Sequence, residues 1–302
     1  MKAFAAFAMR SPLNAGLVVA CTLLLGLALP PLGWVSAGVV ALVALRLGAG
    51  PALRLVIPAV AGLGIAGQLV LGQGVAIAAS ALGFWLPSLV LALVLRQRVR
   101  LDDTLLTACA LGWLLVIGMW VAAGDPVAFW QSWLERAFPP DQWAQRLEVP
   151  VSAMQEMFAS IAPIMTGLLA AATVLGAIVS LLLGRWLQAE LYNPGGFGQE
   201  FRALRLGRSA AVIAVGVCAL GLFTEVAFLQ SLALVAATVY AFQGLAVVHG
   251  VVHGAQMGTP WMAALYIALL PLLPYVVTGL IVVGAADAWA DYRRRVRPRG
   301  SE

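Results

Sequence analysis

Nine long apolar runs follow one another along this chain, separated by short connectors. They lie at about 13–32, 34–47, 55–72, 74–95, 104–123, 161–184, 209–227, 230–250 and 261–284. A helix crosses the roughly 30 Å hydrocarbon core of a bilayer with about 20 such residues, and inside that core helices satisfy their own backbone hydrogen bonds. The sequence therefore predicts an all-α fold: a polytopic transmembrane helical bundle of eight or nine spans, forming one multi-pass membrane domain over residues 1–302.

Composition agrees with a membrane protein. Apolar residues make up 62% of the chain and charged residues only 10%, whereas a soluble globular domain has about 25% charged residues. The three cysteines, Cys21, Cys109 and Cys218, lie inside apolar runs without metal-ligand spacing. We therefore expect neither a metal site nor a cofactor.

The basic residues come in bursts between the apolar runs. The bursts are Lys2 and Arg10; Arg46 and Arg54; Arg96, Arg98 and Arg100; Arg185, Arg202, Arg205 and Arg208; and, in the tail over 290–302, Arg293, Arg294, Arg295, Arg297 and Arg299. Cytoplasmic loops collect Lys and Arg, which predicts a bacterial inner-membrane protein with a cytoplasmic N-terminus. The bursts are topology signals and do not indicate a nucleic-acid partner.

The last third of the chain leaves the number of spans open. Hydropathy favours nine spans, which would place the arginine-rich tail outside the cell. The charge rule favours eight spans, which would place it inside. We prefer eight, with a tilted, broken or re-entrant element in this region. Pro271 and Pro274 mark the final run as the candidate, because irregular backbone at membrane depth is tolerated where protein buries it.

The longest connector, over about 125–160, is predicted to be periplasmic because its acidic residues outnumber its two arginines. Asp125 followed by Pro126 is a helix start signal. Phe129, Trp130 and Trp133 then recur at helical spacing, which indicates an interfacial amphipathic helix. This helix could anchor the protein in the headgroup layer or form a lid over a substrate.

The connector over about 188–208 is predicted to be cytoplasmic, with a glycine-rich turn at 193–198 followed by a basic helix. Phe197, Phe201 and Leu204 would share one face of that helix. An adjacent face would carry Arg202, Arg205 and Arg208. Such a helix either rests on anionic lipid or docks on a partner protein.

Polar residues inside apolar runs are the candidate ligand-binding residues, because ionisable groups at membrane depth are costly. They are Glu225, Gln243, His249 and His253. We expect a cavity bounded by the helices around 225–256, with Gln243, His249 and Glu225 nearest to it. The two histidines have a metal-capable i, i+4 spacing but lack the glutamate of a metalloprotease motif. Interhelical hydrogen bonds would explain Gln243 equally well.

Asp287 and Trp289 are candidate partner-docking residues, together with Arg202, Arg205 and Arg208. The alternative is that Asp287 merely ends the last helix at the membrane interface. Asp291 is spaced to pair with Arg295 at i+4.

Three stretches resemble a known family. They are YAFQGLAVV at 240–248, Pro260-Trp261, and GAADAWADYRR at 284–294. Together they resemble the YybS-like family of bacterial integral membrane proteins, whose function is unknown, and FRALRL at 201–206 is similar to that family's inner-loop motif. The resemblance implies distant similarity to the substrate-binding subunits of energy-coupling-factor vitamin transporters and to the rod-shape protein MreD.

Two functions follow from this resemblance. The first is a solute-binding subunit powered by ATPase subunits on other chains, since this sequence has no Walker motif. The alternative is a membrane scaffold or assembly factor that recruits a partner membrane protein without binding a solute. An enzyme is not expected, because no catalytic triad or paired-carboxylate spacing is present. The lipid bilayer is the remaining expected partner.

Overall fold

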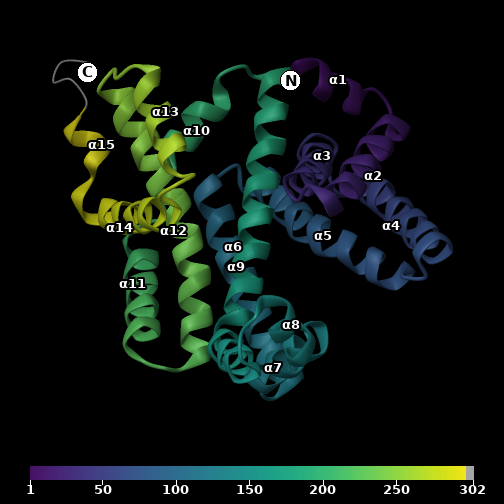
Figure 1. The fold of residues 1–302 in the computed structure, drawn as a ribbon. Coiled ribbons are helices and arrows are strands. Elements are labelled where there is room, and N and C mark those ends of the chain that lie inside the picture. Colours follow the sequence, from purple (N-terminus) through teal and green to yellow (C-terminus); the bar gives the residue numbers. More distant parts are fainter. Residues whose placement is uncertain (297–302) are drawn as a thin grey trace.

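The computed structural model describes residues 1–296, and every regular element in that range is a helix (Figure 1). The helices are α1 (Lys2–Arg10), α2 (Pro12–Ala28), α3 (Pro31–Leu47), α4 (Ala49–Leu71), α5 (Gly74–Arg98), α6 (Leu101–Ala123), α7 (Pro126–Ala137), α8 (Pro140–Leu147), α9 (Val151–Tyr192), α10 (Gly196–Ala203), α11 (Arg208–Phe223), α12 (Ala227–Gly254), α13 (Thr259–Ala268), α14 (Leu273–Ala290) and α15 (Tyr292–Arg295). The all-α prediction is confirmed. Residues 297–302, which include the last two arginines of the tail, lie outside the described residues.

Six helices are long and apolar enough to cross a membrane, namely α4, α5, α6, α9, α12 and α14. The number rises to eight if two bent pairs each count as one span. These pairs are α1 with α2, bent by 120°, and α10 with α11, bent by 64°. Helix α3 is apolar but only 17 residues long. The structure therefore supports six to eight candidate spans in a helical membrane bundle, where the sequence predicted eight or nine.

The arginine bursts meet at one end of the molecule. Arg96 on α5 donates from Nη1 to the Leu45 carbonyl near the end of α3, over 2.7 Å. The Arg46 guanidinium lies 4.1 Å from the ring centre of Tyr192, the last residue of α9. We call this the arginine end.

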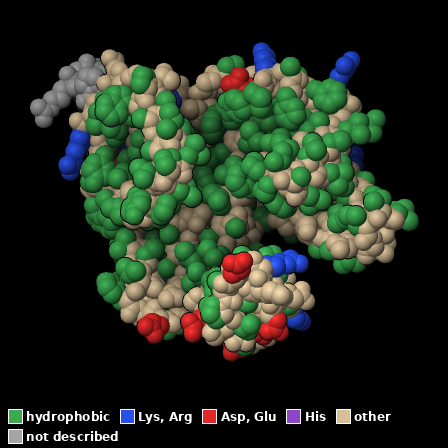
Figure 2. All heavy atoms as spheres, viewed as in Figure 1, with side chains coloured by type: hydrophobic (Ala, Val, Ile, Leu, Met, Phe, Trp, Pro, Cys, Tyr) green, Lys and Arg blue, Asp and Glu red, His purple; other side chains and the backbone are tan. Residues whose placement is uncertain are grey.

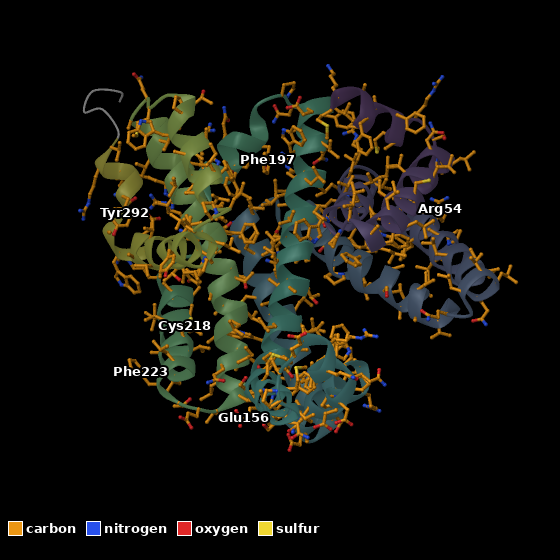
Figure 3. The ribbon with its side chains drawn as sticks, viewed as in Figure 1. Arg54, Glu156, Phe197, Cys218, Phe223 and Tyr292 are labelled. Atoms are coloured by element: carbon orange, nitrogen blue, oxygen red, sulfur yellow. The ribbon has the colours of Figure 1, made fainter. Side chains whose placement is uncertain are left out.

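Acidic side chains gather at the opposite end, over α7, α8 and the α11–α12 connector, and the flanks between the two ends are mostly hydrophobic (Figure 2). Glu156 and Phe223 lie at this acidic end, whereas Phe197 lies near the arginine end (Figure 3). Apolar flanks between two ends that carry the charged side chains are typical of a helical bundle that spans a membrane.

The final apolar run turns back on itself. Gly250, near the end of α12, lies against Arg293, so that a Cβ on this glycine would be 2.7 Å from the arginine Cδ. The segment between them therefore begins and ends at the arginine end. It is broken at residues 269–272, between α13 and α14, where Pro271 lies. The run predicted over 261–284 is thus two helices, α13 and α14, separated by a break. Helix α14 alone is among the six candidate spans, and the eight-span topology that the charge rule favours stays a prediction.

Two pairs of helices cross where glycines face each other. A Cβ on Gly184 of α9 would lie 2.6 Å from the Gly38 carbonyl oxygen of α3. A Cβ on Gly284 of α14 would lie 2.6 Å from the Gly244 nitrogen of α12. Small residues at membrane helix interfaces allow this close backbone approach. The first crossing holds α3 against α9, and the second holds α14 against α12.

A buried hydrogen-bond chain joins the N-terminal helices. Trp85 on α5 donates from Nε1 to the Ser36 hydroxyl on α3, over 2.9 Å. Ser36 in turn donates to the Val19 carbonyl on α2, over 2.7 Å. Both polar side chains are fully buried, so each needs the partner it has.

Helices α7 and α8 pack on the start of α9. Asp125 caps α7 by accepting from the backbone amides of Val127 and Ala128, which confirms the predicted helix start. The Trp130 indole donates to the Thr166 hydroxyl of α9 over 2.9 Å. Leu134, Ala144, Met154 and Phe158 form a small separate core. The connector is therefore a compact helical unit attached to α9, and its role as lipid anchor or lid stays a prediction.

The α5–α6 junction carries backbone strain. Val99, the residue after α5, has φ 55° and ψ 25°, a left-handed conformation that costs a residue with a Cβ about 1–2 kcal/mol. Val99→Gly should therefore raise the free energy of unfolding by about 1 kcal/mol and the midpoint of thermal unfolding in detergent. Val99→Ala retains a Cβ and should gain much less. Equal gains for both variants would contradict the strain argument.

Candidate functional site

The most polar part of the interior is a cluster of three side chains near the arginine end, Gln243 of α12, Asp287 of α14 and Arg293 of α15. All three are buried. Arg293 donates from Nη2 to Asp287 Oδ2 over 2.6 Å, and Gln243 Nε2 donates to the same oxygen over 3.4 Å. We call these three residues the polar cluster.

Backbone groups make further hydrogen bonds with the polar cluster. Arg293 Nη1 donates to the carbonyls of Arg202 and Leu204, both over 2.8 Å. The Leu206 amide donates to Gln243 Oε1 over 3.3 Å. Because residues 204–207 are not helical, their backbone groups need such partners. The polar cluster therefore fastens the α10–α11 connector to α12, α14 and α15.

A second, more exposed layer of contacts surrounds the polar cluster. Arg205 donates to Asp291 and forms an ion pair with it. Arg208 donates from Nε to the Ala288 carbonyl over 3.1 Å. The hydrogen bond from Arg205 lowers the pKa of the Asp291 carboxyl below its ordinary value. This layer holds the end of α14 against the start of α11.

Two sequence predictions about this region were wrong. Arg202, Arg205 and Arg208 do not share a helical face, because α10 ends at Ala203 and α11 begins at Arg208. Asp291 pairs with Arg205 and Arg294 rather than with Arg295. The helix ends at Ala290 and Asp291 has a φ of 45°, so the i, i+4 geometry assumed from a continuous helix is lost.

The four predicted ligand-binding residues do not converge. Gln243 is buried in the polar cluster, whereas Glu225 is exposed in the α11–α12 connector at the acidic end. His249 contacts the Leu245 carbonyl through Nδ1 over 2.8 Å and the Tyr266 hydroxyl through Nε2 over 3.2 Å. His253, at the end of α12, is exposed. Within residues 1–296, no three His, Cys, Asp or Glu side chains are grouped to hold a metal ion.

The predicted docking residues are largely engaged inside the protein. Arg205 and Arg208 hold α14, and Asp287 is buried with Arg293. Trp289 is half exposed. Their docking role stays a prediction. From the sequence, Arg293 was only a topology signal. It lies six residues after Asp287 and beyond the end of the helix, so no helical periodicity pointed to the Asp287–Arg293 pair.

Interhelical pockets are present, but the polar cluster is not one of them. Two adjoining apolar pockets of about 570 and 270 Å³ lie between α5, α6 and α9. Another of about 540 Å³ lies between α11, α12 and α14. Neither these three pockets nor two smaller ones, of about 220 and 140 Å³, are lined by Glu225, Gln243, His249 or His253. The Asp287 carboxylate and the Gln243 amide of the polar cluster are already hydrogen-bonded to other protein groups. The chemistry of the polar cluster therefore suits it to fixing helices in place.

Comparison with known proteins gives one match. A family described as "Predicted membrane protein (DUF2232)" matches residues 17–288. No curated protein matches the chain, and no solved structure does. The matched residues run from within α2 to near the end of α14. They cover five of the six helices that are long and apolar enough to cross a membrane, and all but the last two residues of the sixth, α14. The chain therefore belongs to the DUF2232 family of predicted membrane proteins.

Proposed function

We propose that this protein is a non-enzymatic membrane scaffold that binds another integral membrane protein. In this proposal it lies in the bacterial inner membrane with its N-terminus and its arginine end in the cytoplasm, because short cytoplasmic loops collect arginine.

The observation that carries the proposal is that the side chains of the polar cluster bind one another and nearby backbone groups. Within the described residues, only Arg293 Nε of this cluster is left buried without a partner. Ligand pockets combine apolar walls with a few convergent polar groups that bind the ligand. Here Asp287 accepts hydrogen bonds from Arg293, Gln243 and the Tyr292 amide. Gln243 also accepts one from the Leu206 amide. The larger pockets are apolar. The interior is therefore better suited to holding helices in a fixed arrangement than to binding a polar solute.

Helix α13 offers a surface for the partner. None of its residues is buried, and Trp261 is 61% and Ile267 66% exposed. Its contact with α12 includes the bond between Tyr266 and His249. An apolar helix left uncovered in this way can pack against a transmembrane helix of a second protein.

A solute-binding subunit is the second candidate. The resemblance of residues 240–248 and 284–294 to the YybS-like family favours it, since that resemblance extends distantly to energy-coupling-factor substrate-binding subunits and to MreD. In this case ATPase subunits on other chains would supply the energy.

Site-specific photo-cross-linking separates these functions. A photoreactive phenylalanine analogue replaces Trp261 or Ile267 in living cells, and Leu222, which is 78% exposed on α11, is the control position. We expect one discrete cross-linked protein from α13 and none from α11. Native mass spectrometry should then find the same protein bound at a fixed ratio, without a water-soluble molecule. A vitamin-sized solute bound at a one-to-one ratio, and lost from Gln243→Leu, would overturn the scaffold proposal.

A further inference from the structure

A pocket at the arginine end differs from the apolar pockets because charged side chains line it. It lies between α3, α5, α9 and α10 and has a volume of about 220 Å³. Its lining residues are Leu45, Leu95, Arg96, Val99, Arg185, Gln188 and Glu200. We call it the Arg96 pocket. It is separate from the polar cluster and shares no side chain with it.

Arg96 is exposed and makes one hydrogen bond within the described residues. Its Nη1 donates to the Leu45 carbonyl, and within residues 1–296 its Nε and Nη2 have no hydrogen-bond partner. The guanidinium also lies over Gly48, where a Cβ would be 3.6 Å from Cζ. Gly48 ends α3 and precedes α4, so Arg96 binds at the negative end of the α3 dipole while the positive end of the α4 dipole lies beside it. The two dipole ends offset each other, and it is the remaining N–H donors of Arg96 that can bind an anion.

Arg185 is fixed by its neighbours on the other side of the pocket. Its Nε donates to Glu200 Oε2 over 2.9 Å, and its Nη1 donates to Gln188 Oε1 over 3.0 Å. The side chain is only 16% exposed. Glu200 balances the charge of Arg185, which leaves the Arg96 charge uncompensated among the lining residues. The lining therefore has a net positive charge, and Arg96 supplies the N–H donors, because Arg185 has already committed its own to Glu200 and Gln188.

We propose that the Arg96 pocket binds the phosphate group of a membrane phospholipid. Guanidinium groups match phosphate oxygens with paired N–H donors, and basic pockets between transmembrane helices bind phospholipid headgroups. Leu45, Leu95 and Val99 supply apolar surface beside the charges, which suits the glycerol and acyl region of a lipid. A soluble phosphate ester shares the phosphate chemistry but would leave this apolar surface unused.

The test uses two substitutions that should change the affinity for the lipid in opposite directions. Arg96→Gln removes the uncompensated charge and should weaken binding of short-chain phosphatidylglycerol by about tenfold, the typical contribution of a charge-assisted hydrogen bond. Glu200→Gln raises the net charge of the lining by one and should strengthen binding several-fold. Arg98→Gln changes an exposed arginine two residues away that does not line the pocket, and should leave affinity unchanged.

The measurement is the dissociation constant of the full-length protein in detergent, by titration calorimetry, with glycerol phosphate and an uncharged short-chain diacylglycerol as comparison ligands. We expect phosphatidylglycerol to bind most tightly and diacylglycerol least. Because Arg96 also binds the end of α3, Arg96→Lys is a second variant that retains the charge and should lose less affinity than Arg96→Gln. Weaker binding by Glu200→Gln, or equal affinity for diacylglycerol, would overturn the proposal. Glycerol phosphate binding as tightly as the lipid would reject a lipid as the source of the phosphate.

Discussion

Gly244→Ala is expected to lower the free energy of unfolding by about 3 kcal/mol, the upper part of the usual range for overpacking. The added methyl group would collide with the backbone of α14, since a Cβ at this position would lie 2.6 Å from the Leu280 carbonyl carbon. Backbone atoms cannot rotate away as a flexible side chain can, so α12 and α14 must separate. Thermal unfolding in detergent, followed by circular dichroism, measures the loss.

Gly279→Ala is the control because Gly279 lies on the facing helix α14, next to Leu280, with no atom within 4 Å of an added Cβ. Alanine is favoured over glycine in a helix by roughly 1 kcal/mol, so this variant should be as stable as the wild type or slightly more stable. A Gly244→Ala protein that unfolds at the wild-type temperature would show that the glycine crossing is not closely packed.

Arg293→Met is expected to cost about 3–5 kcal/mol, because removing one member of a buried ion pair leaves the other uncompensated. The side chains of Asp287 and Arg293 are only 1% and 8% exposed. The variant should also free the carbonyls of Arg202 and Leu204. We therefore expect faster proteolysis of the α10–α11 connector as well as a lower unfolding temperature.

A double-mutant cycle tests whether the two charges act together. Asp287→Leu combined with Arg293→Met should be less destabilised than the sum of the single variants, because no unpaired charge remains. Arg100→Gln is the control, since the Arg100 side chain is 64% exposed beside Asp102, and exposed pairs contribute little. Additive losses in the double variant would contradict coupling between Asp287 and Arg293.

Membrane insertion could be predicted from this sequence because it depends on local composition. Each apolar run became a helix or, at Pro271, a broken pair of helices. The helix start at Asp125 was also predictable, since a cap involves only neighbouring residues. Contacts between distant residues were not predictable in this way. Arg293 pairs with Asp287 only because the chain leaves the helical path at Asp291.

In the candidate site, too, the contacts between distant residues could not be predicted from the sequence. Gln243 was identified as a polar residue in an apolar run, and both interhelical bonding and ligand binding were consistent with that position. Only the placement of Leu206 and Asp287 beside it distinguishes the two. The Arg96 pocket had no sequence signal beyond its arginines, because its lining comes from four separate helices.

Helix α9 has a practical consequence for imaging. With 42 residues at 1.5 Å each, it is about 63 Å long, roughly twice the thickness of the hydrocarbon core. The excess length must lie outside the hydrocarbon core, so the ends of α9, one of which carries α7 and α8, should project beyond a detergent micelle or nanodisc. Small membrane proteins without such a projection are hard to orient in electron micrographs, whereas here a rigid feature outside the micelle provides a natural landmark for aligning particles.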